Sequence, residues 1–269
     1  MPLIAFASPK GGVGKTTISA HVAAILARRG YKVIAIDLDP QNALRLHLGV
    51  SIREEGRFVC DLPARPAWQD CVMETDLGVR LLPFGPQDPL RTLELAVALT
   101  QDPALLADPV RDMLSAPDQI VIVDSPPGPN AALTAITPML DLLVLVLLAD
   151  GGSAAIIPQI ASNRFLGRGT LASRSADRAV LVLNQVDEAE PLSEAVMQMA
   201  QNALGKRLIG AICRDQGLAE ALADKRMLIE GEEGAGEDFD VLADAILRRL
   251  RLPGADPQGN PGLFEWRQP

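Results

Sequence analysis

Short apolar runs recur along the chain at intervals that suit a large α/β sheet. Continuous runs of this length are typical of parallel strands that are buried on both faces. Segments with helical spacing alternate with them; Ile18, Val22 and Ile25 lie within one from Thr16 to Arg29, which Gly30 ends. This alternation predicts an α/β fold with a doubly wound, mostly parallel seven- to eight-stranded sheet and helices on both faces. The expected strands are Leu3 to Ala7, Lys32 to Leu38, Val79 to Leu82, Gln119 to Val123, Leu142 to Leu148, Ala179 to Leu183 and Leu208 to Ile212.

Other parts of the chain depart from this alternation. Residues 53–76 contain prolines and fit neither period, so we expect an excursion from the sheet whose place is open. Residues 230–238 are acidic and rich in glycine, which predicts a surface loop, and Val241 to Leu250 predicts a final helix. The proline-rich end predicts a tail without its own fold. We therefore expect one domain over residues 1–252 and a tail over 253–269.

Composition narrows the functional classes. The net charge of −9 argues against a protein that grips nucleic acid through phosphates, although a local basic patch stays possible. Cys60, Cys71 and Cys213 are odd in number and form no CxxC pair, which indicates free thiols in a reducing compartment. The longest apolar run, Leu142 to Ala149, is far shorter than the roughly 20 residues of a membrane span. No basic segment precedes the first apolar run, so we expect a cytoplasmic protein.

The first expected strand runs directly into a glycine-rich loop. This loop is Lys10-Gly11-Gly12-Val13-Gly14-Lys15-Thr16-Thr17. The strict phosphate-loop pattern begins with glycine, where this chain has Pro9, but its second half fits. Glycines let backbone N–H groups face phosphates, and the helix that follows adds its positive end. Lys15 supplies a cation for the β- and γ-phosphates and Thr16 a hydroxyl for Mg²⁺, so the loop predicts a site for ATP and Mg²⁺.

Acidic residues stand where two expected strands end. Asp37 and Asp39 close the second strand, and Asp124 closes a later one, followed by the loop Ser125-Pro126-Pro127-Gly128. Ligands of doubly wound sheets bind at the carboxyl ends of strands, and Mg²⁺ on phosphates needs a nearby carboxylate. Capping of the next helix is the structural alternative for each aspartate.

The sequence KGGVGKTT resembles the deviant Walker family of P-loop ATPases, the ParA/MinD-like proteins. The resemblance implies a homodimer with ATP between the subunits, in which Lys10 reaches the nucleotide of the partner. It implies that Asp39 orients the attacking water, that Asp37 lies near the metal, and that Asp124 is the Walker B aspartate. The Gly128 N–H would sense the γ-phosphate. The catalytic candidates are therefore Lys10, Lys15 and Asp39, and the metal ligands Thr16, Asp37 and Asp124.

Two further residues follow the same resemblance. Asn184 directly follows the expected strand Ala179 to Leu183, where the family carries a residue that recognises adenine. Arg214 follows the strand Leu208 to Ile212 and is similar to a family position that lines the base. A plain surface arginine is the alternative for Arg214.

Several branches of the family can be weighed from the residues. No cysteine lies between Cys71 and Cys213, which argues against an iron–sulfur branch. The late basic residues alternate with acids and favour a solvated face over a DNA-binding one. Val241 to Leu252 has the pattern of a membrane-docking helix, but ordinary packing on the sheet explains it equally, so we expect any membrane association through partners. The late basic residues weighed for DNA binding are Lys206, Arg207, Arg214, Lys225 and Arg226.

The chain is most similar to the BcsQ branch, which takes part in bacterial cellulose biosynthesis. Asn42 to Leu46, Leu81 to Gly85 and Arg214 to Lys225 carry that resemblance. It implies a slowly hydrolysing, Mg²⁺-dependent ATPase switch that regulates or localises the cellulose synthase complex, with subunits of that complex as partners. A positioning ATPase on DNA or membrane, and an ATP-locked scaffold that does not hydrolyse ATP, remain alternatives.

Overall fold

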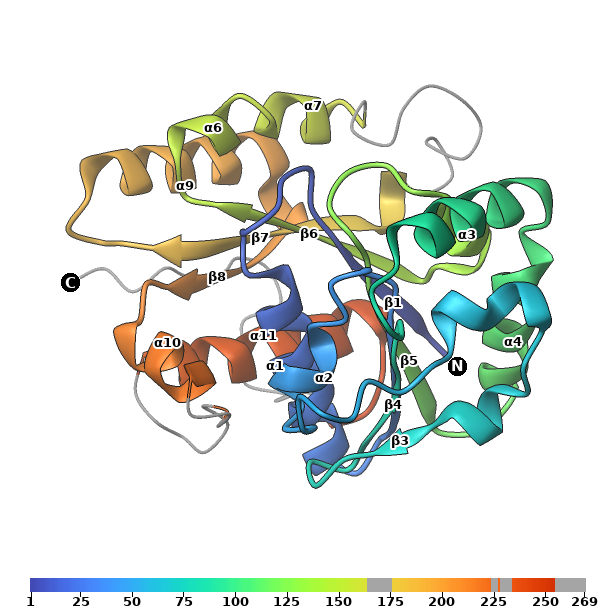
Figure 1. Cartoon of the computed structure of the whole chain (residues 1–269). Helices are drawn as coiled ribbons and strands as arrows, with labels where there is room; N and C mark the ends of the chain where they lie inside the picture. The colour runs from blue at the N-terminus through green and yellow to red at the C-terminus, as the bar shows by residue number, and fades with distance from the viewer. Residues whose placement is uncertain (164–175, 224–226, 228–233, 255–269) are drawn as a thin grey trace.

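An eight-stranded sheet forms the centre of the molecule (Figure 1). The computed structural model describes residues 1–163, 176–223, 227 and 234–254. The strand order is β3-β4-β2-β5-β1-β6-β7-β8, and every pair is parallel except β3 with β4. The predicted doubly wound, mostly parallel sheet is therefore confirmed. The strands are β1 (Leu3–Ala7), β2 (Lys32–Asp37), β3 (Met73–Glu74), β4 (Val79–Leu82), β5 (Gln119–Asp124), β6 (Leu142–Leu148), β7 (Ala179–Val186) and β8 (Leu208–Cys213).

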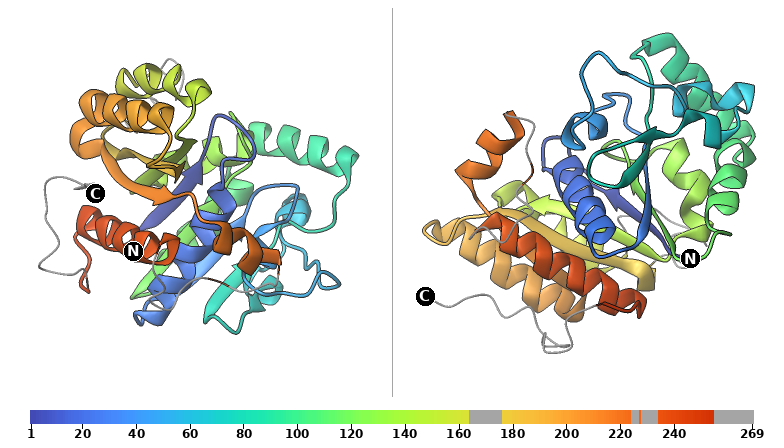
Figure 2. Two further views of the ribbon diagram at one scale, coloured as in Figure 1. Left: turned by 90° about the vertical axis from the view of Figure 1, so that its left-hand side faces the viewer. Right: turned by 90° about the horizontal axis from the view of Figure 1, so that it is seen from below.

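Helices cover both faces of the sheet, and each face has its own apolar core (Figure 2). In β1, Leu3 and Ala5 face one core while Ile4 and Phe6 face the other, which explains why the strand is apolar throughout. One face carries α1 (Lys15–Arg28), α2 (Leu44–His47), α10 (Gln216–Ala223) and α11 (Ala235–Leu250). The other carries η1 (Val59–Ala64), η2 (Trp68–Cys71), α3 (Pro89–Gln101), α4 (Ala104–Met113), α5 (Ala131–Ile136), η3 (Thr137–Met139), α6 (Gly151–Ala154), α7 (Ile157–Ala161) and α9 (Pro191–Leu204). The short turns η5 (Ala176–Arg178) and η6 (Gly205–Arg207) precede β7 and β8.

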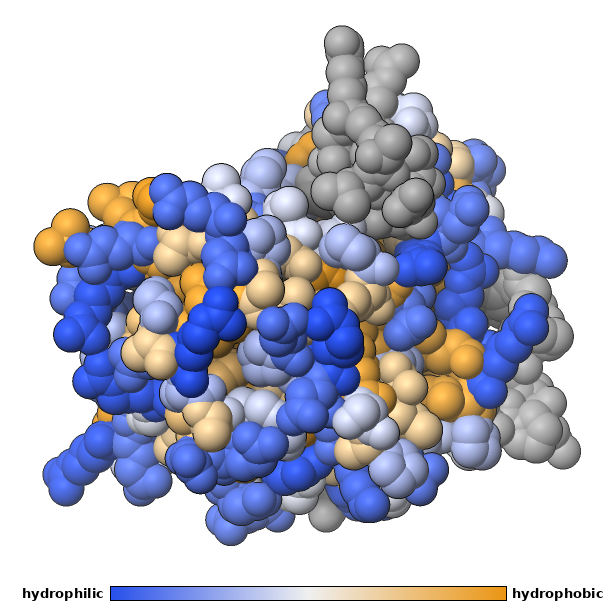
Figure 3. Space-filling model, turned by 90° about the vertical axis from the view of Figure 1, so that its right-hand side faces the viewer, coloured by the Kyte–Doolittle hydropathy of each residue, from blue (hydrophilic) through white to orange (hydrophobic). Residues whose placement is uncertain are grey.

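The excursion at residues 53–76 closes the edge of the sheet beyond β4. Val59 and Cys60 donate backbone hydrogen bonds to the carbonyls that follow β4, and β3 pairs with β4 itself. Phe58 is fully buried in the core under α3. Figure 3 shows the side of the molecule that carries α3 and α4, where Leu90 and Leu93 of α3 are each 66% exposed.

The last helix begins earlier than the sequence predicts. Helix α11 starts at Ala235, so the predicted surface loop at 230–238 is wrong for its last four residues; residues 230–233 lie outside the described part. Glu237 and Asp238 occupy the first turn, where the positive end of the helix dipole favours acidic groups. The acidic composition that suggested a loop therefore belongs to a helix start.

Helix α11 packs on the sheet, as the structural alternative to a membrane-docking helix predicted. Phe239, Leu242 and Ile246 are fully buried against β8 and α1. None of the described helices is long and apolar enough to span a bilayer. Arg207, one of the basic candidates, donates to backbone carbonyls of Ile160 and Ala179 and so has a structural role. Lys225, Arg226 and the expected tail from residue 255 lie outside the described residues.

Candidate functional site: a phosphate loop over two buried carboxylates

The glycine-rich loop joins β1 to α1 at the carboxyl edge of the sheet. Gly12 and Gly14 have φ angles of 74° and 82°, values that glycine adopts without strain. The Ser8 hydroxyl donates to the Lys10 carbonyl at 2.7 Å and fixes the start of the loop. Helix α1 begins at Lys15 and no side-chain hydrogen bond caps this end. Its first N–H groups are therefore available to an anion.

Lys15, Thr16 and Asp124 form one hydrogen-bonded cluster beneath this loop. Lys15 Nζ lies 2.8 Å from Asp124 Oδ1, and the Thr16 hydroxyl donates to Asp124 Oδ2 at 2.7 Å. The side chains of Lys15 and Asp124 are 6% and 0% exposed. Burial raises the pKa of Asp124, and the Lys15 ammonium acts against that shift. The structure thus brings Asp124 to Lys15 and Thr16, which lie more than a hundred residues earlier in the sequence.

Asp37 lies beside Asp124 on the neighbouring strand. The two aspartates are register partners in the β2–β5 pair, and Asp37 is fully buried. Its carboxylate accepts the backbone N–H groups of Asp39 at 2.9 Å and Leu44 at 3.0 Å. Burial first, and then the charge of Asp124, hold the pKa of Asp37 well above its usual range. Asp37 therefore organises the loop that carries Asp39 and also faces the predicted metal position.

The two loops expected to respond to the γ-phosphate follow β2 and β5. Asp39 is half-buried and its carboxylate accepts the Gln41 N–H at 2.9 Å. The Gly128 N–H, expected to sense the γ-phosphate, instead donates to the Ser8 carbonyl at 2.8 Å. In this arrangement Gly128 joins the loop after β5 to the start of the phosphate loop.

Asn184 and Arg214 have different surroundings. Asn184 is 5% exposed, and its Nδ2 donates to the Val13 carbonyl at 2.8 Å, so the side chain supports the phosphate loop. A Cβ placed on Gly14 would lie 2.1 Å from Asn184 Nδ2. Arg214 is 67% exposed at the end of β8, with its NH1 3.9 Å from an Asp187 oxygen. Arg214 is thus open to a ligand at this edge, whereas Asn184 is already engaged.

Lys10 lies against its own chain. A Cβ placed on Gly152, in α6, would be 2.1 Å from Lys10 Nζ. Nearby Asp150 has a lowered pKa: burial would raise it, but hydrogen bonds from Ser153 and the positive charge of Lys10 outweigh burial. The predicted contact of Lys10 with a partner's nucleotide therefore requires the side chain to turn away from α6.

The residues at this edge fit Mg²⁺ and a triphosphate. Oxygen donors from Thr16, Asp37 and Asp124 are the ligand type that Mg²⁺ takes, with the remaining positions left for phosphate and water. Lys15 and the free N–H groups of the loop and of α1 supply the positive charge that phosphates need.

Residues 1–247 match the family described as cellulose biosynthesis protein BcsQ. The chain belongs to the BcsQ family. It is 23% identical to BcsQ of Salmonella typhimurium over 257 residues, which cover 92% of this chain and 94% of the relative. The chromosome-partitioning ATPase Soj of Thermus thermophilus is 41% identical over 125 residues, 46% of this chain and 46% of that protein.

Solved structures show the same fold. MinD of Pyrococcus horikoshii, complexed with Mg-ADP, has a TM-score of 0.71 at 23% identity and covers 91% of this chain and 95% of its own. The resemblance to ParA/MinD-like proteins and to BcsQ is thereby confirmed. Proteins of this wider family are P-loop ATPases.

Two residues beside the site of this BcsQ family member were not predicted from the sequence. Asp150 follows the carboxyl end of β6, and the strand-end argument that found Asp124 would have found it too. Asn42 is buried behind the loop after β2, where its side chain bonds Glu55 and Phe84. Asn42 stands in a segment that carries the BcsQ resemblance, but nothing local shows its contacts, because its partners lie farther along the chain.

Proposed function

We propose that this protein is a Mg²⁺-dependent ATPase that works as a dimeric switch on the bacterial cellulose synthase complex. The observation that carries the ATPase part is the buried cluster of Lys15, Thr16 and Asp124 under a glycine loop with an uncapped helix end. The match of residues 1–247 to the BcsQ family supports the proposed role in cellulose biosynthesis. The protein would act in the cytoplasm and reach a membrane only through partners.

The residues would divide the work as follows. The loop N–H groups and Lys15 bind and orient the β- and γ-phosphates, and Thr16 with Asp37 and Asp124 holds Mg²⁺, which offsets phosphate charge when bound. Asp39 accepts a hydrogen bond from the attacking water and orients it. Arg214 lines the adenine, and Asn184 acts mainly by supporting the loop at Val13.

Lys10 would act across the dimer. An ammonium group beside the partner's phosphates offsets charge that builds up in phosphoryl transfer. In the present structure Lys10 instead lies against α6 of its own chain, which would be its position when it does not contact the partner. Exchange between these two positions would couple ATP binding to dimer formation.

Release of phosphate from ATP, with and without Mg²⁺, tests the enzyme. Wild type should release phosphate slowly, Lys15→Ala should not bind ATP, and Asp39→Ala should bind ATP without turnover. Wild type that binds ATP but releases no more phosphate than Asp39→Ala, alone or with its partners, supports the ATP-locked scaffold instead. If calorimetry detects no binding of ATP with Mg²⁺ to the folded protein, the proposed ATPase function is wrong.

The proposed role in cellulose biosynthesis needs its own test. Deleting the gene should abolish or mislocalise cellulose output, and the wild-type gene but not Lys15→Ala should restore it. The partial match to Soj favours one other candidate, a positioning ATPase that acts on DNA. ATP-dependent gel shift of nonspecific DNA at low salt, together with normal cellulose output in the deletion strain, would select that alternative.

A further inference from the structure

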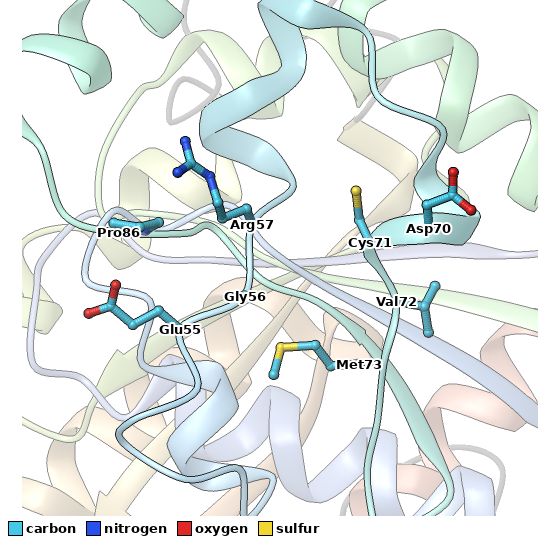
Figure 4. Close-up of a pocket in the computed structure, with 8 residues that line it drawn as sticks. All are labelled: Glu55, Gly56, Arg57, Asp70, Cys71, Val72, Met73 and Pro86. Atoms are coloured by element: carbon cyan, nitrogen blue, oxygen red, sulfur yellow. The ribbon is translucent and has the colours of Figure 1, made fainter.

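A groove of about 570 Å³ lies within the excursion at residues 53–76, away from the phosphate loop (Figure 4). Glu55 to Arg57 form one wall, Asp70 to Met73 form the other, and Pro86 also lines it. Gly56 has a φ of 60° and packs closely on the opposite wall, since a Cβ there would lie 2.5 Å from Met73 Sδ. Glycine thus lets the two walls approach, and the space left between them has the size of an ordinary ligand site.

The groove has an apolar lining and a net negative charge. Arg57 is neutralised, because its guanidinium binds both oxygens of Asp61 at 2.7 and 2.9 Å. Neither Glu55 nor Asp70 forms an ion pair with any described residue, and both are exposed on opposite walls (Figure 4). The apolar part of the lining comes from Cys71, Val72, Met73 and Pro86.

The groove is also at the edge of the sheet. Strand β3, which includes Met73, pairs only with β4 and is the terminal strand of the sheet. Extended segments of other proteins add to such edges through backbone hydrogen bonds, with side chains alternating between two directions. An extended segment that alternates basic and apolar side chains would therefore match both the edge and the charge.

Asn42 ties one wall of the groove to the loop that carries Asp39. Asn42 is 3% exposed, its N–H donates to the Asp39 carbonyl, and its side chain donates to the Glu55 carbonyl at 3.0 Å. The Asn42 Oδ1 accepts the Phe84 N–H at 3.1 Å. Arg45, one turn on, donates to the carbonyl of Ser51 at 3.0 Å. A shift of this loop must therefore move the wall at Glu55 or break buried hydrogen bonds, which is costly.

We propose that this groove binds an extended, basic segment of a partner protein, and that the loop after Asp37 controls the groove through Asn42. Charge complementarity selects this occupant, because no described residue forms an ion pair with Glu55 or Asp70, whereas Arg57 is already bound to Asp61. The proposal that the groove binds a peptide does not rest on the proposed function. Control of the groove by nucleotide rests on the proposed function, because Asp37 and Asp39 are the groups that would face Mg²⁺ and water.

A fluorescein-labelled ten-residue peptide of alternating lysine and valine is the probe, with binding followed by anisotropy. Glu55→Gln with Asp70→Asn should weaken binding about fivefold to tenfold. The matched control, Glu188→Gln with Glu194→Gln, removes two exposed acids elsewhere and should leave the affinity within about twofold. A peptide of alternating glutamate and valine should not bind. No binding of the lysine peptide, or equal weakening in both double variants, overturns the proposal.

Cys71 locates the binding site directly. N-ethylmaleimide on Cys71 should block peptide binding to wild type and leave Cys71→Ser unaffected, which separates this thiol from Cys60 and Cys213. Cys71→Ser itself should bind the peptide as wild type does. If the reagent blocks both proteins, or neither, the peptide does not occupy the groove.

Asn42→Asp tests the control by nucleotide. Aspartate tolerates the positive φ of 50° and keeps an acceptor for Phe84, but it puts a carboxylate oxygen against the Glu55 carbonyl. ATP with Mg²⁺ should change the peptide affinity of wild type by about threefold or more, and leave that of Asn42→Asp unchanged although calorimetry shows ATP bound. ATP binding to wild type without any change in peptide affinity overturns the control. Absence of ATP binding defeats the proposed function and leaves the groove result standing.

Discussion

The contact between Gly14 and Asn184 allows a quantitative test of how the phosphate loop is held. Gly14 has a φ of 82°, and a Cβ there would lie 2.1 Å from Asn184 Nδ2. Gly14→Ala thus pays a left-handed backbone cost of roughly 1–2 kcal/mol. It must also displace Asn184 from the Val13 carbonyl, and that hydrogen bond contributes about 1 kcal/mol. We expect a loss of about 2–3 kcal/mol in the free energy of unfolding.

A double-mutant cycle separates the two parts. Asn184→Ala alone should cost about 1–3 kcal/mol, because the Val13 carbonyl loses its partner. In the Asn184→Ala background the overlap is gone, so Gly14→Ala should cost only the backbone part, about 1–2 kcal/mol. Urea unfolding of the nucleotide-free protein, with equal m-values for all four proteins, measures this. An equal cost of Gly14→Ala in both backgrounds would refute the idea that Asn184 supports the loop.

Two further predictions concern Lys10 and His21. Lys10→Ala should keep nucleotide affinity but fail to form the ATP-dependent dimer in light scattering. The control Lys32→Ala, which removes an exposed lysine at the amino-terminal end of β2, should dimerise. A dimeric, fully active Lys10→Ala protein would exclude the role of Lys10 across the interface. His21 is fully buried on Phe239, and burial lowers its pKa from 6.5 to about 4, so the unfolded chain binds a proton that the folded chain does not as the pH falls from 6.5 to 4. The free energy of unfolding of wild type should therefore fall by on the order of 3 kcal/mol over this pH window relative to that of His21→Phe. Parallel profiles of this free energy against pH for the two proteins would contradict the prediction.

The sheet was predictable because its strands are buried on both faces. Continuous apolar runs such as Leu142 to Leu148 have the length of a strand rather than of a typical helix, and the phosphate loop identified the first strand. Strand β3 was not predictable, since two residues form it and their pairing depends on β4. The start of α11 was missed because acidic residues at 237 and 238 suit both a loop and a helix N-terminus.

The candidate site divides in the same way. Asp37 and Asp124 could be placed at the same edge of the sheet because both stand at strand ends, and the structure makes them register partners. The positions of Lys10 and Asn42 could not be inferred, because each depends on chain segments that only the packed fold brings near. Local sequence thus specifies the phosphate chemistry, whereas long-range packing specifies how its loops connect to the rest of the surface.

The two buried carboxylates imply that binding of Mg²⁺ and nucleotide releases a proton. Lys15 lies 2.8 Å from Asp124 and favours its charged form, whereas Asp37 has only backbone N–H partners and a pKa held well above its usual range. The raised pKa favours the protonated form of Asp37 in the nucleotide-free protein, and a divalent cation beside it favours the ionised form. Calorimetry of ATP with Mg²⁺ in buffers of different ionisation enthalpy counts the protons, which should be released in greater number as the pH falls below the raised pKa of Asp37. Binding heats that do not depend on the buffer at either mildly acidic or neutral pH would show that no proton is released, and so that Asp37 is already ionised before the metal arrives.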